Sequence, residues 1–366
     1  MKILLIGGQS IPGIGGVESY MLNIAKSLRE QDNEVTLLCS DREAFTQEIE
    51  GIRVIHKRCP KSNIIAIPLL FMKSIGYIAK HHKDIDVVNF QSILFAFVAG
   101  WFARLCRCKV CYTIHSLAED SPKYGRMLKC LIKIITFISI YLCGKRIITI
   151  SRSKAEEIKC RYGKRCFVIP CGVNMPTSCG ISDILTRHGI VAGHYYLSIG
   201  RIDPIKNLDT LIEAFMRHND SDYQLVIAGN YDNSYGADLR AMAKPNDRII
   251  FTGSVMGDDK EQLLTNSFAN CLISSSEGMP LALLEAMAHG KPSIVTDISA
   301  IREVMRPEWG LWCRVRDVES VIEQMARVEA EPDKIYADAA LMADHVAKYH
   351  TWESIASQYV DYLHKI

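Results

Sequence analysis

Residues 195–229 read YYLSIGRIDPIKNLDTLIEAFMRHNDSDYQLVIAG, and this stretch contains one complete unit of the fold. The segments 195–200 and 223–229 are short, mostly apolar runs that end in glycine, which is typical of buried strands. Between them, residues 207–218 have the pattern of a helix. A strand, a helix and a second strand in this order predict parallel pairing, because the helix returns the chain to the same end of the sheet.

The same alternation continues on both sides of this unit. Towards the C-terminus, strands are predicted at 248–253, 269–275 and 292–297, with helices at 236–243, 258–266 and 281–289 and a helical tail. Towards the N-terminus, a helix is predicted at 17–30 and strands at 2–7, 34–40, 52–57, 86–91, 109–116, 146–151 and 166–172. We therefore expect an α/β protein with two doubly wound, Rossmann-like domains that face each other across a cleft.

The boundary between the two predicted domains is a segment rich in Gly, Pro, Ser and Thr. Residues 172–194 have this composition, which predicts a linker. The expected domains are therefore 1–172 and 190–350. In such a pair, the usual ligand site is a cleft between the carboxyl ends of the two sheets.

The composition is that of a globular protein. The chain has 366 residues, of which 48% are hydrophobic and 23% charged, and these values exclude disorder and coiled coil as the main organisation. Its longest uncharged apolar runs are too short for a spanning helix. The sequence begins with MKILLIGG, which predicts a first strand rather than a signal peptide. The 13 cysteines form no disulfide framework, so we expect reduced thiols and a cytoplasmic location.

Charge is distributed unevenly between the two halves of the chain. Residues 1–170 contain 26 Lys and Arg against 14 Asp and Glu, whereas the remainder contains 17 against 27. The basic half suits an anionic partner such as a phosphate or an acidic bilayer surface. Nucleic acid is not expected, because the cationic stretches are apolar and contain no binding motif.

Three segments contain the candidate chemistry. The first is the glycine-rich turn GGQSIPGIGGVES at 7–19, in which Gly13, Gly15 and Gly16 precede a helix. Free amides at a helix N-terminus can bind phosphate or sugar oxygens. The alternative is a tight strand-to-helix turn with no ligand.

The second segment, SIGRIDPIKN at 198–207, places Arg201 and Lys206 in a loop after a predicted strand. A guanidinium and an ammonium at the carboxyl edge of a sheet can hold a diphosphate. The alternative is an ordinary pair of surface cations.

The third segment, SSSEGMPLALLEAMAHGKP at 274–292, contains Glu277 before a predicted helix and Glu285 within it. Carboxylates accept hydrogen bonds from pairs of sugar hydroxyls. The alternatives are a charge that interacts with the helix dipole for Glu277 and a solvated helix position for Glu285.

Taken together, these segments resemble a glycosyltransferase of family 4 with the GT-B architecture. The resemblance covers nearly the whole chain. It rests on GGVE at 15–18, His115, IPCGVN at 169–174, GRIDPIKN at 200–207, FTGSV at 251–255, the E-x7-E pair of 277–285 and TWESIASQY at 351–359. In this family the last of these motifs is a closing helix that crosses back to the N-terminal domain, so residues 351–366 are expected there.

The resemblance also implies roles for individual residues. Arg201 and Lys206 would neutralise the leaving diphosphate, so that neither a metal nor another cofactor is required. Glu277 would contact the transferred sugar and Glu285 the ribose, while His115 would lie beside the reacting carbon. The remaining donor-binding positions would be Gly15 and Gly16 at the phosphate or sugar, Gly253 and Val255 at the base, and the backbone of Gly278, Met279, Pro280 and Leu281 at the sugar.

The implied activity is transfer of a hexose or N-acetylhexosamine, with retention of configuration, from a UDP- or GDP-sugar. The implied acceptor is a lipid-linked or cell-surface glycan of the capsule, O-antigen or exopolysaccharide type. Two alternatives remain open at this point. One is a UDP-sugar epimerase with the same architecture, and the other is a non-catalytic subunit that binds a sugar nucleotide or a membrane.

Two stretches in the basic half combine cations with apolar residues. Residues 57–83 and 123–146 have the composition of helices that lie on an anionic membrane, which predicts a peripheral location at the inner face of the cytoplasmic membrane. The alternative is that their apolar faces pack on the sheet. For 123–146 we expect partial burial.

Overall fold

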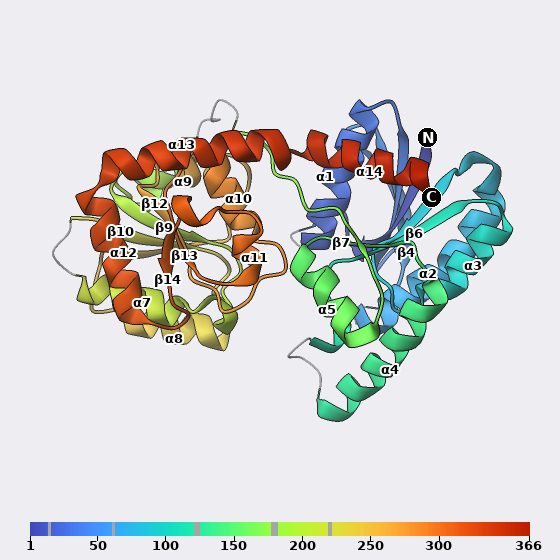
Figure 1. Cartoon of the computed structure of the whole chain (residues 1–366), viewed down its shortest axis with the longest axis horizontal. Helices are drawn as coiled ribbons and strands as arrows, with labels where there is room; N and C mark the ends of the chain where they lie inside the picture. Colours follow the sequence, from blue (N-terminus) through green and yellow to red (C-terminus); the bar gives the residue numbers. More distant parts are fainter. Residues whose placement is uncertain (14–15, 61–62, 121–124, 177–181, 219–221) are drawn as a thin grey trace. The chain divides into compact units, whose positions relative to one another are not determined.

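The computed structural model describes residues 1–13, 16–60, 63–120, 125–176, 182–218 and 222–366 (Figure 1). Contacts divide the chain into two compact units. The first comprises Met1–Gly172 together with Trp352–Ile366, and the second comprises Val173–Thr351. Both are built around a parallel sheet, so the predicted pair of α/β domains is confirmed.

The first unit contains an eight-stranded sheet with the order β3-β4-β2-β1-β5-β6-β7-β8. Every pair is parallel except β3 with β4. The strands are β1 (Lys2–Gln9), β2 (Glu34–Asp41), β3 (Phe45–Ile49), β4 (Ile52–Arg58), β5 (Val87–Phe90), β6 (Lys109–Ile114), β7 (Ile147–Thr149) and β8 (Phe167–Val168). The central strands are buried on both faces, which explains their nearly continuous hydrophobicity.

Helices cover this sheet. They are α1 (Gly16–Glu30), α2 (Asn63–His81), α3 (Ala96–Leu105), α4 (Arg126–Cys143), α5 (Arg152–Tyr162) and α14 (Trp352–Lys365), with short 3-10 turns η1 (His82–Asp84) and η2 (Ala118–Asp120). The last helix is fastened to the unit by polar contacts. Lys109 Nζ donates to the Leu363 carbonyl over 3.1 Å, and the Asn89 amide donates to the Tyr359 hydroxyl.

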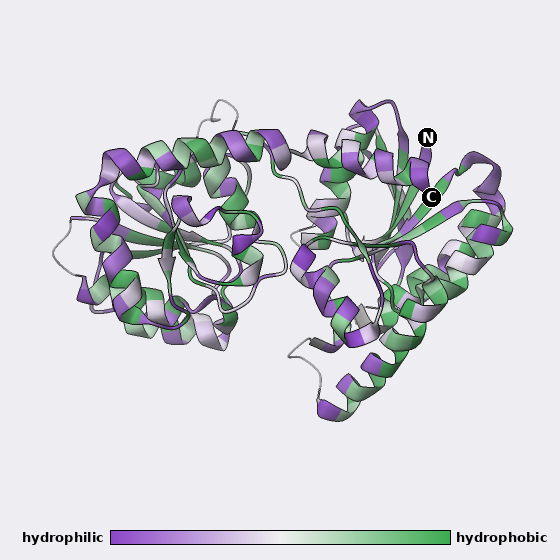
Figure 2. Cartoon of the chain, viewed as in Figure 1, coloured by the Kyte–Doolittle hydropathy of each residue, from purple (hydrophilic) through white to green (hydrophobic). Residues whose placement is uncertain are grey.

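The second unit contains a six-stranded, fully parallel sheet with the order β11-β10-β9-β12-β13-β14. Its strands are β9 (Tyr195–Ile199), β10 (Gln224–Ala228), β11 (Ile249–Gly253), β12 (Ala269–Leu272), β13 (Ser293–Thr296) and β14 (Leu311–Cys313). Its helices are α6 (Ile184–His188), α7 (Leu208–Arg217), α8 (Ser234–Ala243), α9 (Gly257–Asn266), α10 (Leu281–Ala288), α11 (Ser299–Arg302), α12 (Val318–Ala330) and α13 (Pro332–Tyr349), with the 3-10 turns η3 (Pro204–Lys206) and η4 (Pro307–Trp309). In Figure 2 the strands inside each unit are largely apolar.

Three local predictions need correction. The segment 172–194 is not simply a linker, because it contains α6, and Ile184 and Ile190 are buried in the core of the second unit. The hairpin partner β3 was not predicted, since its sequence FTQEI is largely polar and lies at the sheet edge. Strand β14 was assigned to the helical tail, although it pairs with β13.

The two long helices in the basic stretches, α2 and α4, differ in how much of their apolar surface is buried. Helix α2 packs on α3 and buries Leu70, Phe71 and Ile78. Helix α4, which we expected to be partly buried, has a narrow buried stripe and a broad exposed apolar face. In the described part of the chain, each cysteine is a free thiol. Over the same residues, none of the helices combines the length and the apolarity needed to cross a bilayer.

Candidate active site

The predicted cations of the second unit lie in the loop that follows β9. Gly200 ends this strand with φ +144°, a value that favours glycine, and Arg201 follows it. The Asp203 carboxylate accepts the Ile205 amide and starts the turn η3, which places Lys206 at the end of the loop. The Arg201 side chain is 77% exposed, and its Nε lies 3.5 Å from Asp203 Oδ2. The local sequence therefore presents one exposed and one anchored cation.

Asn207 joins this loop to the next motif. It is buried and adopts φ +49°, a left-handed conformation that asparagine tolerates better than most residues. Its side-chain amide donates to the Ile273 carbonyl over 2.8 Å and to the Ser275 hydroxyl over 2.9 Å. The Ser275 amide in turn donates to the Ile205 carbonyl over 2.8 Å. Asn207 is a site residue beyond those predicted from the sequence, and the preference of asparagine for this conformation is the signal that marks it.

Lys206 and Glu277 form the central contact of the site. Lys206 Nζ lies 2.7 Å from Glu277 Oε1, and the two side chains are only 19% and 12% exposed. The hydroxyl of Ser274, a buried residue, donates to the same oxygen over 2.6 Å. Both contacts use Oε1, and the described residues provide no hydrogen bond or ion pair to the other carboxylate oxygen. Ser274 is a further site residue that the sequence analysis did not identify.

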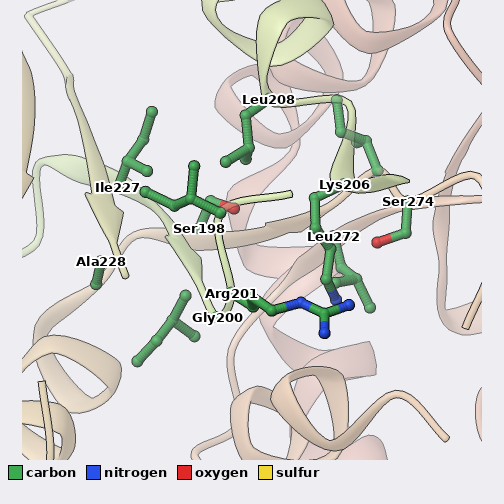
Figure 3. A pocket seen from close by; sticks show the side chains of 12 residues that line it. Ser198, Gly200, Arg201, Lys206, Leu208, Ile227, Ala228, Leu272 and Ser274 are labelled. Carbon is green, nitrogen blue, oxygen red and sulfur yellow. The ribbon is translucent and has the colours of Figure 1, made fainter. Parts of the chain in front are cut away.

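A small cavity lies beside this contact (Figure 3). Its volume is about 10 Å³, which is the space of one water molecule. A ligand as large as a nucleotide does not fit inside this cavity. The lining comes from the ends of β9, β10 and β12 and the loop after β9, namely Ser198, Ile199, Gly200, Arg201, Ile202, Lys206, Leu208, Ile227, Ala228, Leu272, Ile273 and Ser274.

Glu285 has a different partner from Glu277. It lies in α10 and pairs with Lys260 of α9, whose Nζ is 2.8 Å from Glu285 Oε1. Lys260 is a third cation near the predicted site. Its pairing with Glu285 could not be predicted from the sequence, because the two residues lie on different helices and are 25 positions apart in the chain. Val255 packs against a cluster that includes Ala286, the residue after Glu285. Gly253 ends β11 with φ +79°, and a methyl group on its Cα would face open space, with no neighbouring atom within 4 Å.

The turn before α10 offers fewer donors than the resemblance implies. Pro280 has no N–H group, and the Leu281 amide donates to the Met279 carbonyl over 2.9 Å. The Met279 and Leu281 side chains pack against the core. Only the Gly278 and Met279 amides are without a backbone partner among the described residues. We therefore correct the predicted set of four backbone donors to these two.

A second polar cluster lies at the carboxyl ends of β5 and β6 in the first unit. His115 Nε2 is 2.9 Å from Gln91 Oε1, and the His115 ring meets the Tyr20 ring edge-on with centroids 4.8 Å apart. Burial lowers the pKa of His115 to about 4, so its imidazole is neutral near pH 7. Gln91 Nε2 and the Tyr20 hydroxyl are buried and have no partner in the described structure. Gln91 was the polar end of a predicted strand, and it adds a hydrogen-bonding group beside His115.

The burial of the His115 imidazole predicts that the stability of the protein depends on pH. The imidazole has an ordinary pKa of 6.5 and a folded value of about 4, so between these values the unfolded chain binds a proton that the folded chain does not. We therefore expect the free energy of unfolding to fall as the pH decreases from 6.5 towards 4. His115→Gln should weaken this decline in urea unfolding, whereas His364→Gln, at an exposed position of α14, should not. Equal slopes for all three proteins would contradict the interpretation.

The glycine-rich turn is described only in part. Gly15 lies outside the described residues, whereas Gly16 is the first residue of α1. Glu18, in the first turn of that helix, accepts the Gln9 amide over 2.7 Å. The acid of the GGVE motif thus holds the end of β1 against the start of α1. The Gly16 amide lies at a helix start, where N–H groups lack partners within the helix.

The described residues offer no cluster of metal ligands. Over the residues described, no three His, Cys, Asp or Glu side chains gather closely enough to hold a metal ion. The two acids of the segment Asp84-Ile85-Asp86 contact Lys2. Asp84 Oδ1 lies 3.1 Å from Lys2 Nζ, and Asp86 Oδ2 accepts the Lys2 amide over 2.7 Å.

Comparisons with known proteins agree with this fold. A family model described as "Glycosyltransferase Family 4" matches residues 14–175, and one described as "Glycosyl transferases group 1" matches residues 188–341. A UDP-Gal:α-D-GlcNAc-diphosphoundecaprenol α-1,3-galactosyltransferase of Escherichia coli is 26% identical, over 89% of this chain and 88% of its own length. A GDP-mannose:cellobiosyl-diphosphopolyprenol α-mannosyltransferase of Komagataeibacter xylinus is also 26% identical, over 84% and 78%.

Solved structures show the same fold. HepE of Anabaena, determined in complex with UDP-glucose, superposes with a TM-score of 0.77 at 18% identity, with coverage of 100% of both chains. Sucrose-phosphate synthase of Thermosynechococcus elongatus gives 0.76 at 19% identity, with coverage of 100% of this chain and 98% of its own. The two family matches follow one another along the chain and coincide with its two sheets. The chain therefore belongs to glycosyltransferase family 4 and has the GT-B fold.

Proposed function

We propose that this glycosyltransferase transfers a hexosyl or N-acetylhexosaminyl group from a UDP- or GDP-sugar to a lipid-linked or cell-surface glycan, with retention of configuration. The observation that carries the proposal is the contact of Glu277 with both Lys206 and Ser274, beside Arg201 at the carboxyl edge of the second sheet. Relatives named for UDP-galactose and GDP-mannose as donors and for diphosphopolyprenol-linked acceptors support the substrate classes.

The proposed chemistry follows from the charges of these side chains. The bond between the anomeric carbon and the diphosphate oxygen breaks, and a bond from the acceptor hydroxyl to that carbon forms on the same face. The acceptor proton passes to the leaving phosphate. Negative charge grows on the diphosphate during this step, so the preplaced cations Arg201 and Lys206 stabilise the transition state more than the ground state. In this proposal they provide the charge that a metal ion supplies in other transferases.

The other site residues keep the roles implied by the resemblance. Glu277 binds hydroxyls of the transferred sugar through its unoccupied oxygen, and Glu285 binds the ribose. His115, which is neutral, acts as a hydrogen-bonding group rather than as an acid. These assignments are part of the proposal.

Incubation of the purified chain with a panel of UDP- and GDP-sugars and a diphosphopolyprenol-linked saccharide tests this function. The expected result is release of a nucleoside diphosphate together with a new glycosidic linkage. A modified sugar with no new linkage would instead indicate an epimerase. No conversion of any donor would contradict the proposal.

We also propose that the protein lies on an anionic membrane, and that α4 forms the contact. Its exposed face includes Met127, which is 88% exposed, and Ile134, which is 58% exposed, together with Leu128, Leu131, Phe137, Ile138 and Tyr141. The sequence from 121 to 155 contains no Asp or Glu, and Arg126 and Lys133 are exposed on the same helix. An apolar helix face flanked only by cations suits a bilayer with acidic headgroups.

The double variant Leu131→Ser/Ile134→Ser tests this contact by sedimentation with phosphatidylglycerol vesicles. We expect binding to weaken by about tenfold or more, because each apolar side chain removed from the bilayer contributes about 1.5–3 kcal/mol at full burial. Val191→Ser/Leu341→Ser is the matched control, since these side chains are similarly exposed in the second unit. If both double variants bind vesicles equally, α4 is not the membrane surface.

A further inference from the structure

A groove at the carboxyl ends of β1, β2 and β4 has no role in the function proposed above. These strands are neighbours in the first sheet, so the residues that follow them meet at one edge. Two cavities of about 190 and 490 Å³ lie there and share Arg42, Cys59 and Pro60. The larger one is also lined by Arg58 and Lys73. We call the two cavities together the carboxyl-end groove.

The groove contains three cations from three elements. Arg42 follows β2, Arg58 ends β4 and Lys73 lies in α2, and each of them is exposed. The Lys73 ammonium donates to the Arg58 carbonyl, which holds it at the end of β4. Within the described residues, none of the three forms an ion pair with a carboxylate.

One carboxylate borders the groove, but it is already engaged. Asp41 Oδ2 lies 3.0 Å from His56 Nδ1, and Asp41 Oδ1 accepts the Arg42 amide over 2.6 Å. Partial desolvation acts to raise the pKa of Asp41, but hydrogen bonds from the Arg42 amide, Ser10 and His56 outweigh it and hold the pKa below its ordinary value. Asp41 is therefore ionised and offsets one of the three positive charges, so the groove keeps a net positive charge.

The opposite end of the same sheet provides a contrast. A cavity of about 460 Å³ lies there, lined by cations that include Lys2, Arg29 and Arg53. The acids Glu34 and Asp84 line it too, and Lys2 pairs with Asp84 over 3.1 Å. At the amino end of the sheet these three cations share the cavity with two acids, whereas at the carboxyl end three cations share the groove with one acid. Like charges that share a cavity repel each other, and an anion bound among them would relieve that repulsion.

We propose that the carboxyl-end groove binds the phosphate or diphosphate of the acceptor. This inference rests on the proposed function, which requires an acceptor, and it gives that acceptor an anionic group bound by the first unit. Two guanidinium groups can each hold phosphate oxygens as a fork, and Lys73 adds a point charge. The relatives whose names include a diphosphopolyprenol acceptor support the same class of ligand.

The binding test uses the full chain with the proposed donor site disabled. Inorganic pyrophosphate is titrated by calorimetry into the Arg201→Gln/Lys206→Gln variant, so that heat from the second unit is removed. Adding Arg42→Gln/Arg58→Gln should weaken the remaining binding by about tenfold or more, because two charge-assisted contacts are lost. Adding Arg53→Gln, which removes a cation from the opposite end of β4, should leave it unchanged. Equal affinity in all three proteins, or no binding in any, overturns the proposal.

A competition experiment distinguishes whether the groove binds the diphosphate of a lipid or only a free anion. Farnesyl diphosphate, a short lipid diphosphate, should displace pyrophosphate from the variant with the disabled donor site, whereas farnesol should not. Failure of farnesyl diphosphate to displace pyrophosphate would overturn the assignment to an acceptor, since the groove would then bind only a free anion. The titration and the displacement experiment measure binding and do not require sugar transfer. A failure of the proposed transferase activity would therefore appear separately, in the incubation with the panel of nucleotide sugars.

Discussion

Lys206→Gln is expected to lower the rate of sugar transfer by about a hundredfold to a thousandfold. This is the range for loss of one preorganised charge that stabilises a developing anion. The ammonium is held in place by Glu277 over 2.7 Å and by the turn η3. The measurement is kcat and KM with the nucleotide sugar that the panel identifies.

Two further variants make this result specific. Lys206→Arg keeps the charge and should recover part of the rate. Lys334→Gln is the matched control, because Lys334 pairs with Glu331 at 3.9 Å on an exposed surface of the same unit. Exposed pairs of this kind contribute little, so this variant should transfer sugar at the normal rate. A wild-type rate for a folded Lys206→Gln protein, with folding checked by its melting temperature, would remove Lys206 from the mechanism.

Glu277→Gln should lower kcat by about a hundredfold without weakening the binding of the nucleoside diphosphate. The amide keeps the shape of the carboxylate, and Ser274 can still donate to its oxygen. Lys206 loses the carboxylate that neutralises it in the free protein, so its charge becomes more available to phosphate. The sugar loses an acceptor for its hydroxyl groups, which accounts for the lower rate.

The combination of lower kcat and retained diphosphate affinity distinguishes a sugar-binding carboxylate from a merely structural one. Glu331→Gln, which removes the acid of the exposed control pair, should change neither quantity. Parallel loss of diphosphate affinity and rate in Glu277→Gln would show instead that Glu277 only positions Lys206.

Most strands of both sheets could be predicted because they are short and buried on both faces. Their hydrophobicity is then nearly continuous, and loops and helices interrupt it at regular intervals. Strand β3 lacks this signal, because it is an edge strand with exposed polar side chains. Its partner β4 follows after only Glu50 and Gly51, both with positive φ, so a two-residue hairpin turn was the only local indication.

The site residues that belong to short sequence motifs could be predicted. Those that are brought to the site only by tertiary contacts could not. Lys206 and Glu277 belong to the two motif segments, and the pairing of β9 with β12 brings those segments together. Lys260 and the carboxyl-end groove depend on helix packing and on strand order, which no short pattern encodes. Likewise, α2 and α4 have similar compositions, and only the packing of α2 against α3 shows which of them leaves its apolar face exposed.

The central claim is that the cations of the loop after β9 hold the diphosphate of an activated sugar. Its most direct test is the melting temperature of the wild-type, Lys206→Gln and Glu277→Gln proteins with saturating UDP or GDP, because a ligand that binds only the folded chain raises that temperature. For one of the two nucleotides, the account predicts a rise in the wild type and in Glu277→Gln, and little or none in Lys206→Gln. An equal rise in Lys206→Gln would contradict it.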